Sequence, residues 1–138
     1  MAGSFLDTNV LIYLASSDAA KAGRAEALLA AGGVVSVQVL NEIANVARRK
    51  MGLTWAETHE FLRSVRGFVS VRGVDVDDHE AGLALAERYG LSVYDAMIAA
   101  SALNAGCEVL WSEDMHDGLV IDGRLHIENP FRPAVPGG

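Results

Sequence analysis

Short apolar runs alternate with longer segments in which apolar residues recur at helical spacing. Buried strands are predicted at residues 4–6, 34–37, 68–74 and 108–111. Helices are predicted from residue 10 and over residues 18–31, 38–50, 54–66, 77–89 and 93–105. Leu119 to Ile127 reads as a hairpin around Asp122-Gly123. Strands that alternate with helices predict an α/β domain with a mostly parallel central sheet.

Polar residues mark where several of these helices begin. Thr54 with Glu57 forms a capping-box pattern, Asp77 with Glu80 is a similar cap signature, and Ser92 with Asp95 repeats it. Glycines after the helical segments, such as Gly90, act as stop signals. The boundaries are therefore set by local chemistry as well as by the hydrophobic period.

The length of 138 residues predicts one domain over residues 1–138, with a Pro/Gly-rich tail from about Pro130 that is frayed. The apolar fraction of 51% is slightly above the globular average, and the excess is mostly Ala, Val and Leu. Such a composition indicates tightly packed helices, surface that a partner buries, or simply an alanine-rich genome. The sequence leaves these alternatives open.

The single cysteine, Cys107, has no internal disulfide partner and lies in an apolar context, so we predict a packing residue in a reducing compartment. The start of the chain lacks a basic leader, and the apolar run at residues 10–15 is far too short to span a membrane. We therefore expect a cytoplasmic protein with no membrane partner. The net charge of −7 argues against a broad nucleic-acid-binding surface, although metal-binding carboxylates would inflate the negative total.

Four acidic residues occupy junctions where a strand ends or a helix begins: Asp7, Glu42, Asp95 and Asp114. Ligands of open α/β sheets bind beyond the carboxyl ends of the strands, and Asp7 and Asp114 both follow predicted strands. If the four meet, they need a cation, because like charges raise one another's pKa. Carboxylates suit Mg²⁺ or Mn²⁺, and these ions suit phosphate substrates. The pattern predicts a metal-dependent phosphodiesterase, most readily a small ribonuclease.

Each acid also has a structural interpretation. Asp7 is placed to cap a helix, Glu42 to face solvent, and Asp114 to form a turn. For Asp95 the two readings are evenly balanced, since Ser92-x-x-Asp95 is nearly a capping box but Asp reaches back less well than Glu.

Several neighbours of these acids are candidates for supporting roles. Thr8 and Asn9 are suited to orient Asp7 or to bind a metal-bound water. Ser36 reads as a cap or turn residue, and His116 is a less favoured ligand or base. Glu113 and Asp117 add carboxylates near Asp114, so the ligand set stays open.

Four segments together resemble the PIN-domain family, and in particular the VapC toxins of bacterial VapBC toxin–antitoxin pairs. They are Leu6-Asp7-Thr8-Asn9-Val10-Leu11, Ser36-x-Gln38-Val39-Leu40-Asn41-Glu42, Tyr94-Asp95-Ala96-x-Ile98-Ala99-Ala100-Ser101-Ala102 and Leu110-x-Ser112-Glu113-Asp114-Met115. The resemblance covers nearly the whole chain in the right order and spacing. It implies a PIN-like three-layer α/β/α domain.

By that resemblance, Asp7, Glu42, Asp95 and Asp114 form the catalytic acidic site, and Asp7, Asp95, Asp114 and Asp117 bind metal, with Thr8, Asn9 and Ser112 in support. The resemblance further implies cleavage of RNA, such as tRNA or rRNA, with Mg²⁺ or Mn²⁺ as cofactor. It also implies a homodimer and a VapB-like antitoxin whose tail occupies the active-site groove.

Basic and aromatic residues suggest further surfaces. Arg48, Arg49 and Lys50 either steer RNA or complement the helix dipole, and Arg63 and Arg66 offer the same choice. Trp55, Phe61 and Phe68 line a partner surface or belong to the core.

Other functions compete with the ribonuclease. A haloacid-dehalogenase-like phosphatase uses an aspartate after the first strand, but needs a second one where this chain has Asn9. A PIN-like scaffold that binds RNA or protein without cutting would be expected to lack some of the acids, and all four are present. A nuclease that acts on single-stranded DNA is not excluded by the sequence.

Overall fold

A six-stranded sheet forms the centre of the protein. The computed structural model describes residues 3–132, and the strands lie in the order β3-β2-β1-β4-β6-β5. All neighbouring strands are parallel except β5 and β6, which are antiparallel. The strands are β1 (Ser4–Leu6), β2 (Val34–Ser36), β3 (Ser70–Arg72), β4 (Val109–Trp111), β5 (Val120–Ile121) and β6 (Leu125–Glu128). The predicted mostly parallel sheet is confirmed.

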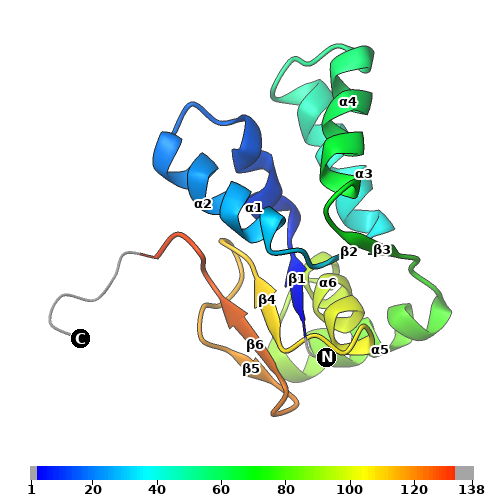
Figure 1. Ribbon diagram of the computed structural model, residues 1–138. Helices are drawn as coiled ribbons and strands as arrows, with labels where there is room; N and C mark the ends of the chain where they lie inside the picture. The colour runs from blue at the N-terminus through cyan, green and yellow to red at the C-terminus, as the bar shows by residue number, and fades with distance from the viewer. Residues whose placement is uncertain (1–2, 133–138) are drawn as a thin grey trace, which may run out of the picture.

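The helices cover both faces of this sheet. They are α1 (Thr8–Leu11), the 3₁₀ helix η1 (Ile12–Ala15), α2 (Ala19–Ala30), α3 (Val37–Arg49), α4 (Trp55–Arg66), α5 (Val76–Tyr89) and α6 (Val93–Asn104). The chain steps outward from β1 to β3 and then crosses back past β1 to β4. Right-handed crossovers place the outward and the returning helices on opposite faces. In Figure 1, α1 and α2 lie to the left of β1, and α5 and α6 lie to its right, which gives three α/β/α layers.

The core lies between the sheet and these helices. Phe5 and Leu110 on the central strands are fully buried, and α6 is buried from Ala96 to Ala102. Gly82 of α5 allows a close approach of α5 to α6, because a Cβ there would lie 2.5 Å from the sulfur of Met97. Cys107 is buried in this core, as expected. At α5 and α6, the small residues therefore serve tight helix packing.

Helix capping follows the sequence at two positions and departs from it at a third. The capping box of Thr54 and Glu57 is present, and Ser92 caps α6. At α5 the prediction was wrong, because the capping box joins Asp75 and Asp78 and not Asp77 and Glu80. Burial of Asp78 against Arg72 and Asn104 gives the reason, since these contacts at 3.2 and 2.5 Å fix the start of the helix earlier.

The third strand is shorter than predicted. Only Ser70–Arg72 pairs with β2, whereas the sequence suggested residues 68–74. Phe68 is instead 56% exposed and lies in the turn that ends α4, where its N–H donates a hydrogen bond to the carbonyl of Val65. The hairpin of β5 and β6 is confirmed, with Asp122 and Gly123 at φ 53° and 67°, as its tight turn requires.

The chain remains packed beyond the point where fraying was predicted. Pro130 is buried, and the Phe131 ring meets the Tyr13 ring edge-on at 4.7 Å. The predicted tail therefore does not begin at Pro130, and its remainder, residues 133–138, lies outside the described residues. Over residues 3–132, none of the helices has the length and apolar character needed to cross a membrane.

Candidate active site

The carboxyl ends of β1 and β4 are neighbours at the point where the strand order reverses. β1 pairs with β2 on one side and with β4 on the other, so the connections leave it in opposite directions. Such a switch point is where open α/β sheets bind ligands. Asp7 follows β1 and Ser112 follows β4, and the Ser112 hydroxyl donates a 2.8 Å hydrogen bond to the Asp7 carboxylate.

Asp7 is an N-cap and also a candidate ligand. One carboxylate oxygen accepts from the Thr8 N–H at 2.7 Å, which caps α1, and the other accepts from Ser112. Burial raises the pKa of Asp7 to about 6, against the lowering effect of these hydrogen bonds, and the charges of Glu42 and Asp95 raise it further. Asp7 therefore does cap α1, as one of the two interpretations predicted. Its carboxylate is nevertheless buried and is repelled by the charges of Glu42 and Asp95.

Glu42 reaches the same place from α3. The Thr8 hydroxyl donates to one Glu42 oxygen at 2.6 Å, and the Gln38 amide donates to the other at 3.2 Å. Gln38 lies one turn before Glu42 on α3, where side chains four apart are neighbours. Thr8 thus holds Asp7 through its backbone and Glu42 through its side chain, so Glu42 is oriented and is not a freely solvated helix residue.

Asp95 approaches from the first turn of α6 on the other face of the sheet. The Ser92 hydroxyl accepts the Asp95 N–H at 3.2 Å, but among the described residues no return bond from the Ser92 N–H to the Asp95 carboxylate completes a capping box. Burial raises the pKa of Asp95, and the charges of Asp114 and Glu42 raise it as well. Ser92 therefore performs the capping, and the Asp95 carboxylate is left for the acidic cluster.

Asp114 is the exposed member of the group. It lies in the loop after β4, and its charge acts on Asp95. Within residues 3–132, its carboxylate accepts no hydrogen bond. The structure therefore brings together the four acids that the sequence singled out, from β1, α3, α6 and the loop after β4.

The negative charge of this cluster is not balanced by an ion pair within residues 3–132. Over the described part of the chain, none of the four carboxylates forms an ion pair, whereas five other pairs are present on the same molecule. Hard oxygen donors that repel one another fit a divalent cation such as Mg²⁺ or Mn²⁺. As the side chains stand between residues 3 and 132, no three Asp, Glu, His or Cys groups are close enough to hold one ion. A Mg²⁺ ion that keeps several waters needs only one or two protein carboxylates, so it is compatible with this spacing.

Asn9 and Ser112, which the sequence suggested as supporting groups, both contact Asp7, and their role in a metal site stays a prediction. Asn9 donates to Asp7 at 3.5 Å and to Ser112 at 3.4 Å, and its carbonyl accepts the Glu113 N–H at 3.0 Å. Ser112 is fully buried beside Asp7. Ser36 is the N-cap of α3, which is the plainer of its two readings.

Within residues 3–132, no hydrogen bond or ion pair joins the side chains of the two other predicted candidates, Asp117 and His116, to the four acids. The Asp117 carboxylate accepts from the Asn129 N–H at 2.8 Å and from Arg132 at 2.6 Å. These bonds engage both of its oxygens, so we leave Asp117 out of the cluster. His116 is exposed in the same loop.

Arg48, the first of the three basic residues predicted to steer RNA, has a structural role. Arg48 donates to the carbonyl of Leu53 at 2.6 Å and lies over the Trp55 ring at 4.4 Å, so it fastens the turn between α3 and α4. Arg49 and Lys50 are exposed at the end of α3, about 10 Å along the helix from Glu42. Arg63 and Arg66 are exposed near the end of α4. Their contact with RNA stays a prediction.

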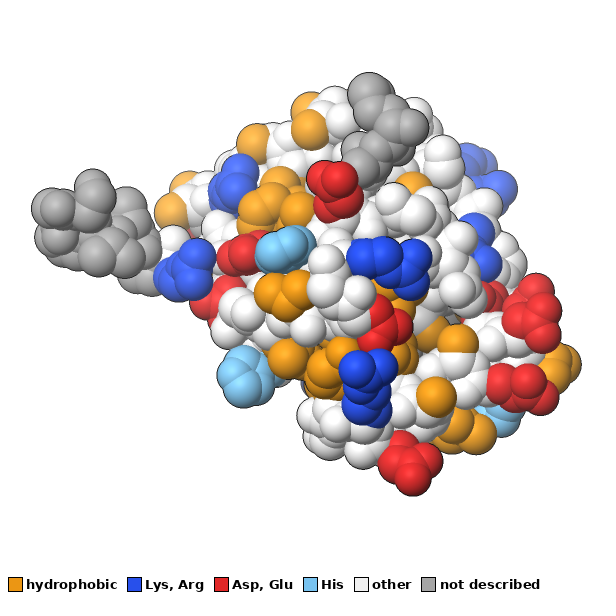
Figure 2. Space-filling model, turned by 90° about the horizontal axis from the view of Figure 1, so that it is seen from below, with side chains coloured by type: hydrophobic (Ala, Val, Ile, Leu, Met, Phe, Trp, Pro, Cys, Tyr) orange, Lys and Arg blue, Asp and Glu red, His pale blue; other side chains and the backbone are white. Residues whose placement is uncertain are grey.

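One cavity lies away from the four acids, at the opposite ends of the strands. It has a volume of about 790 Å³ and is lined by residues that include Cys107, Glu108 and His126, near the start of β4. Figure 2 shows the molecule from below the view of Figure 1, and on this face acidic, basic and hydrophobic side chains are interspersed. This cavity contains none of the four acids, so chemistry and not volume identifies the candidate site.

Comparison with known proteins assigns the fold to a family. The sequence model of the PIN-domain family matches residues 4–116, a segment that contains all four acids. The chain belongs to the PIN-domain family. Among curated proteins, none matches the sequence. The predicted PIN resemblance is thereby confirmed for the fold.

Several solved toxin and toxin–antitoxin structures resemble this one over most of their length. A toxin–antitoxin complex from Klebsiella pneumoniae has a TM-score of 0.71 at 23% identity and covers 94% of this chain and 99% of its own. The sarcin–ricin-loop-cleaving toxin VapC20 of Mycobacterium tuberculosis has a TM-score of 0.60 at 22% identity, with 80% and 89% covered. VapBC2 from Rickettsia felis, bound to promoter DNA, has a TM-score of 0.64 at 19% identity, with 91% and 97% covered.

Reasoning from the sequence assigned no role to several residues that hold side chains in or next to this cluster. Gln38 orients Glu42, and the spacing of four on one helix was the available signal. Tyr13 and Lys21 hold Glu113, the residue before Asp114. No local pattern could have indicated that contact, because Lys21 and Glu113 are 92 positions apart.

Proposed function

We propose that this chain is a metal-dependent endoribonuclease and the toxin of a toxin–antitoxin pair. The observation that carries the proposal is the cluster of Asp7, Glu42, Asp95 and Asp114, which repel one another and have no basic partner within residues 3–132. Membership of the PIN family and the VapC and VapBC structures among its structural relatives support it.

The chain's own residues divide the work of such a site. Asp7, Asp95 and Asp114 supply carboxylate oxygens, and Glu42 adds a fourth group oriented by Thr8 and Gln38. When bound, Mg²⁺ or Mn²⁺ lowers the pKa of water and neutralises charge at a scissile phosphate. Asn9 and Ser112 hold Asp7 in one orientation, so it does not have to be ordered when substrate arrives.

Cleavage assays with matched substrates test the activity. An RNA and a single-stranded DNA of the same sequence are incubated with the protein and with Mn²⁺, Mg²⁺ or a chelator. We expect cleavage of RNA that stops on chelation, and a loss of roughly hundredfold or more in Asp7→Asn and Asp95→Asn. Asp122→Asn is the matched control, because Asp122 pairs with Arg88 on another part of the surface. Full activity of Asp7→Asn overturns the proposed site.

An apolar groove offers a place for an antitoxin segment. Its volume is about 460 Å³, and Leu14, Leu29, Phe61 and Val65 contribute to its lining together with Glu26, Glu57 and Glu60. Apolar walls with acidic side chains suit an amphipathic helix that carries basic residues. Phe61 is thus half-buried at a groove, while Trp55 and Phe68 are 61% and 56% exposed.

Association is tested by mass in solution. We expect the isolated chain to form a homodimer, and we expect the product of an adjacent small reading frame to co-purify with it. Phe61→Asp should abolish antitoxin binding while leaving metal-dependent cleavage of RNA in place. If the protein is strictly monomeric and the co-expressed product of the adjacent reading frame does not bind it, Trp55 and Phe68 do not belong to a partner surface.

A further inference from the structure

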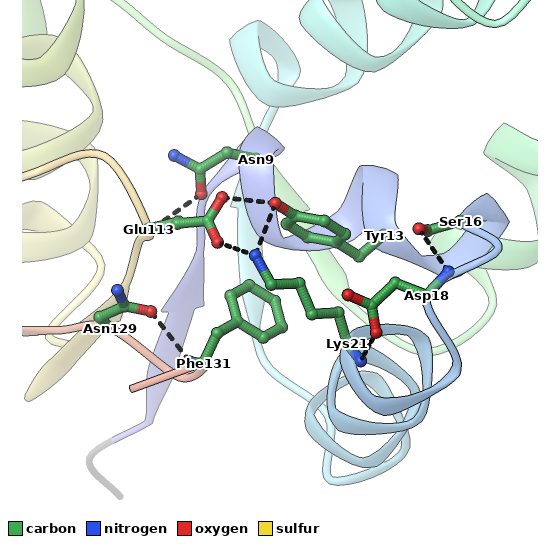
Figure 3. Close-up of polar contacts among 8 residues, drawn as sticks. All are labelled: Asn9, Tyr13, Ser16, Asp18, Lys21, Glu113, Asn129 and Phe131. Carbon is green, nitrogen blue, oxygen red and sulfur yellow. Dashed lines mark hydrogen bonds and ion pairs between the residues drawn. The ribbon is translucent and has the colours of Figure 1, made fainter. Parts of the chain in front are cut away.

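The residue before Asp114 is held from two directions. The Glu113 carboxylate accepts from the Tyr13 hydroxyl at 2.6 Å and from the Lys21 ammonium at 2.8 Å, while its N–H donates to the Asn9 side chain at 3.0 Å (Figure 3). Both the backbone and the side chain of Glu113 are thereby fixed to the helical segment that follows β1. Asp114 has no such contact of its own in the described chain, so its position depends on this loop.

Aromatic rings enclose the Lys21 ammonium on the same side. It donates to the Tyr13 hydroxyl at 3.1 Å and lies 4.6 Å from the centre of the Tyr13 ring and 5.3 Å from that of Phe131. Figure 3 shows Phe131 and Tyr13 flanking the lysine stem. Lys21 and Glu113 retain only 34% and 23% side-chain exposure. An ammonium with several fixed partners holds its geometry better than an isolated surface ion pair.

The far end of the same loop is fastened separately. Asp117 accepts from the Asn129 N–H and from Arg132, both in the segment that also carries Phe131. Asp114 therefore lies between two attachment points, at Glu113 and at Asp117. Asp117 lies only three residues from Asp114, but both of its carboxylate oxygens are used to fasten this end of the loop.

We propose that Lys21 and Tyr13 are positioning residues of the acidic site, which act through Glu113 to hold the loop that carries Asp114. The inference rests on the proposed ribonuclease function for its catalytic consequence, but the fastening of the loop is a property of the protein alone. The competing role for Lys21 is direct contact with a substrate phosphate. That role needs a free ammonium, whereas this one is already bound to Glu113 and Tyr13.

Hydrogen exchange of the metal-free protein tests the fastening without any activity. The variants are Lys21→Met, which keeps most of the stem, Lys21→Arg and Tyr13→Phe. Arg124→Met is the control, because it removes one positive charge at an exposed residue of the β5–β6 turn. In Lys21→Met and Tyr13→Phe we expect the Glu113 and Met115 amides to exchange about threefold faster or more, with the amides of α4 unchanged. Unchanged loop protection in both variants overturns the proposal.

Kinetics and metal titration then separate positioning from substrate contact. Positioning predicts that Lys21→Met and Tyr13→Phe both lower kcat by about tenfold and weaken Mn²⁺ binding in calorimetry, with KM and the salt dependence of RNA binding unchanged. Lys21→Arg should recover most of the loss, since a guanidinium can also donate to Glu113 and Tyr13. A raised KM and a salt slope reduced by about one in Lys21→Met, with Tyr13→Phe silent, would show phosphate contact and overturn the proposal. Wild-type protein that cleaves no RNA overturns the proposed function but not the loop fastening, which exchange measures by itself.

Discussion

The Ser112 hydroxyl and the Asp7 carboxylate are 105 positions apart in sequence and 2.8 Å apart in the fold. The bond joins the carboxyl ends of β1 and β4, the two central strands. It fixes one oxygen of Asp7 while Thr8 fixes the other. The most buried acid of the cluster is therefore oriented by the sheet itself, before any cation or substrate binds.

Removal of this bond should raise the pKa of Asp7. The Ser112 hydroxyl stabilises the charged form of Asp7 and lowers a pKa that burial raises to about 6. In Ser112→Ala we expect the Asp7 pKa of the metal-free protein to rise further, because the charged form loses this hydrogen bond. Carboxyl-carbon NMR titration measures it. The control is Ser92→Ala, which touches Asp95 and should leave the Asp7 titration in place.

Asp7 should cost stability at neutral pH. Its folded pKa of about 6 lies above the reference value of 3.8, so the folded protein holds this proton more tightly than the unfolded chain. The cost of ionisation, about 3 kcal/mol at most, is complete above pH 6 and disappears as the pH falls towards 4. Asp7→Asn should therefore unfold at a higher temperature than wild type at pH 7.5, with the difference shrinking by pH 4.5. A less stable variant at pH 7.5 would mean that the hydrogen bonds of the carboxylate outweigh its burial.

Divalent cations should stabilise the protein through the same cluster. A ligand that binds only the folded state stabilises it by about 2.7 kcal/mol at a hundred times its dissociation constant. We expect Mn²⁺ to raise the melting temperature of wild type, with a much smaller effect in Asp95→Asn. Thermal denaturation with and without chelator provides the measurement. Asp122→Asn should respond as wild type does, since Asp122 lies in the β5–β6 hairpin turn.

Arg48 and Arg49 should separate stability from RNA binding. Arg48 fastens Leu53 and covers Trp55, so Arg48→Met should destabilise the fold by about 1 kcal/mol in urea denaturation. Arg49 is exposed, and Arg49→Glu should weaken RNA binding and flatten its salt dependence. An unchanged salt slope in Arg49→Glu would remove this end of α3 from the substrate path.

The helix start at Asp75 illustrates where local reading of the sequence fails. Asp75, Asp77 and Asp78 all suit a cap, and only the buried contacts of Asp78 with Arg72 and Asn104 decide among them. Similarly, Pro130 and Phe131 carry no pattern of order, yet Phe131 packs on Tyr13 from the other end of the chain. Where several nearby residues suit the same role equally well, contacts with residues distant in the sequence decide which one takes it.

Local sequence was enough to predict the alternation of strands and helices, the capping box at Thr54 and the turn at Asp122-Gly123, because these features depend on residues close together in the chain. Local sequence also pointed to the four acids; Asp7, Asp95 and Asp114 lie close to a strand end or a helix start, whereas Glu42 lies within α3. Parallel strands bring such positions to one edge. Three outcomes became visible only in the folded protein: Asp95 does not complete a capping box, Asp117 binds Arg132, and Lys21 holds Glu113. These outcomes depend on which side chains the strand order 3-2-1-4-6-5 brings within hydrogen-bonding distance, and burial then raises the free energy of any polar group left unpaired.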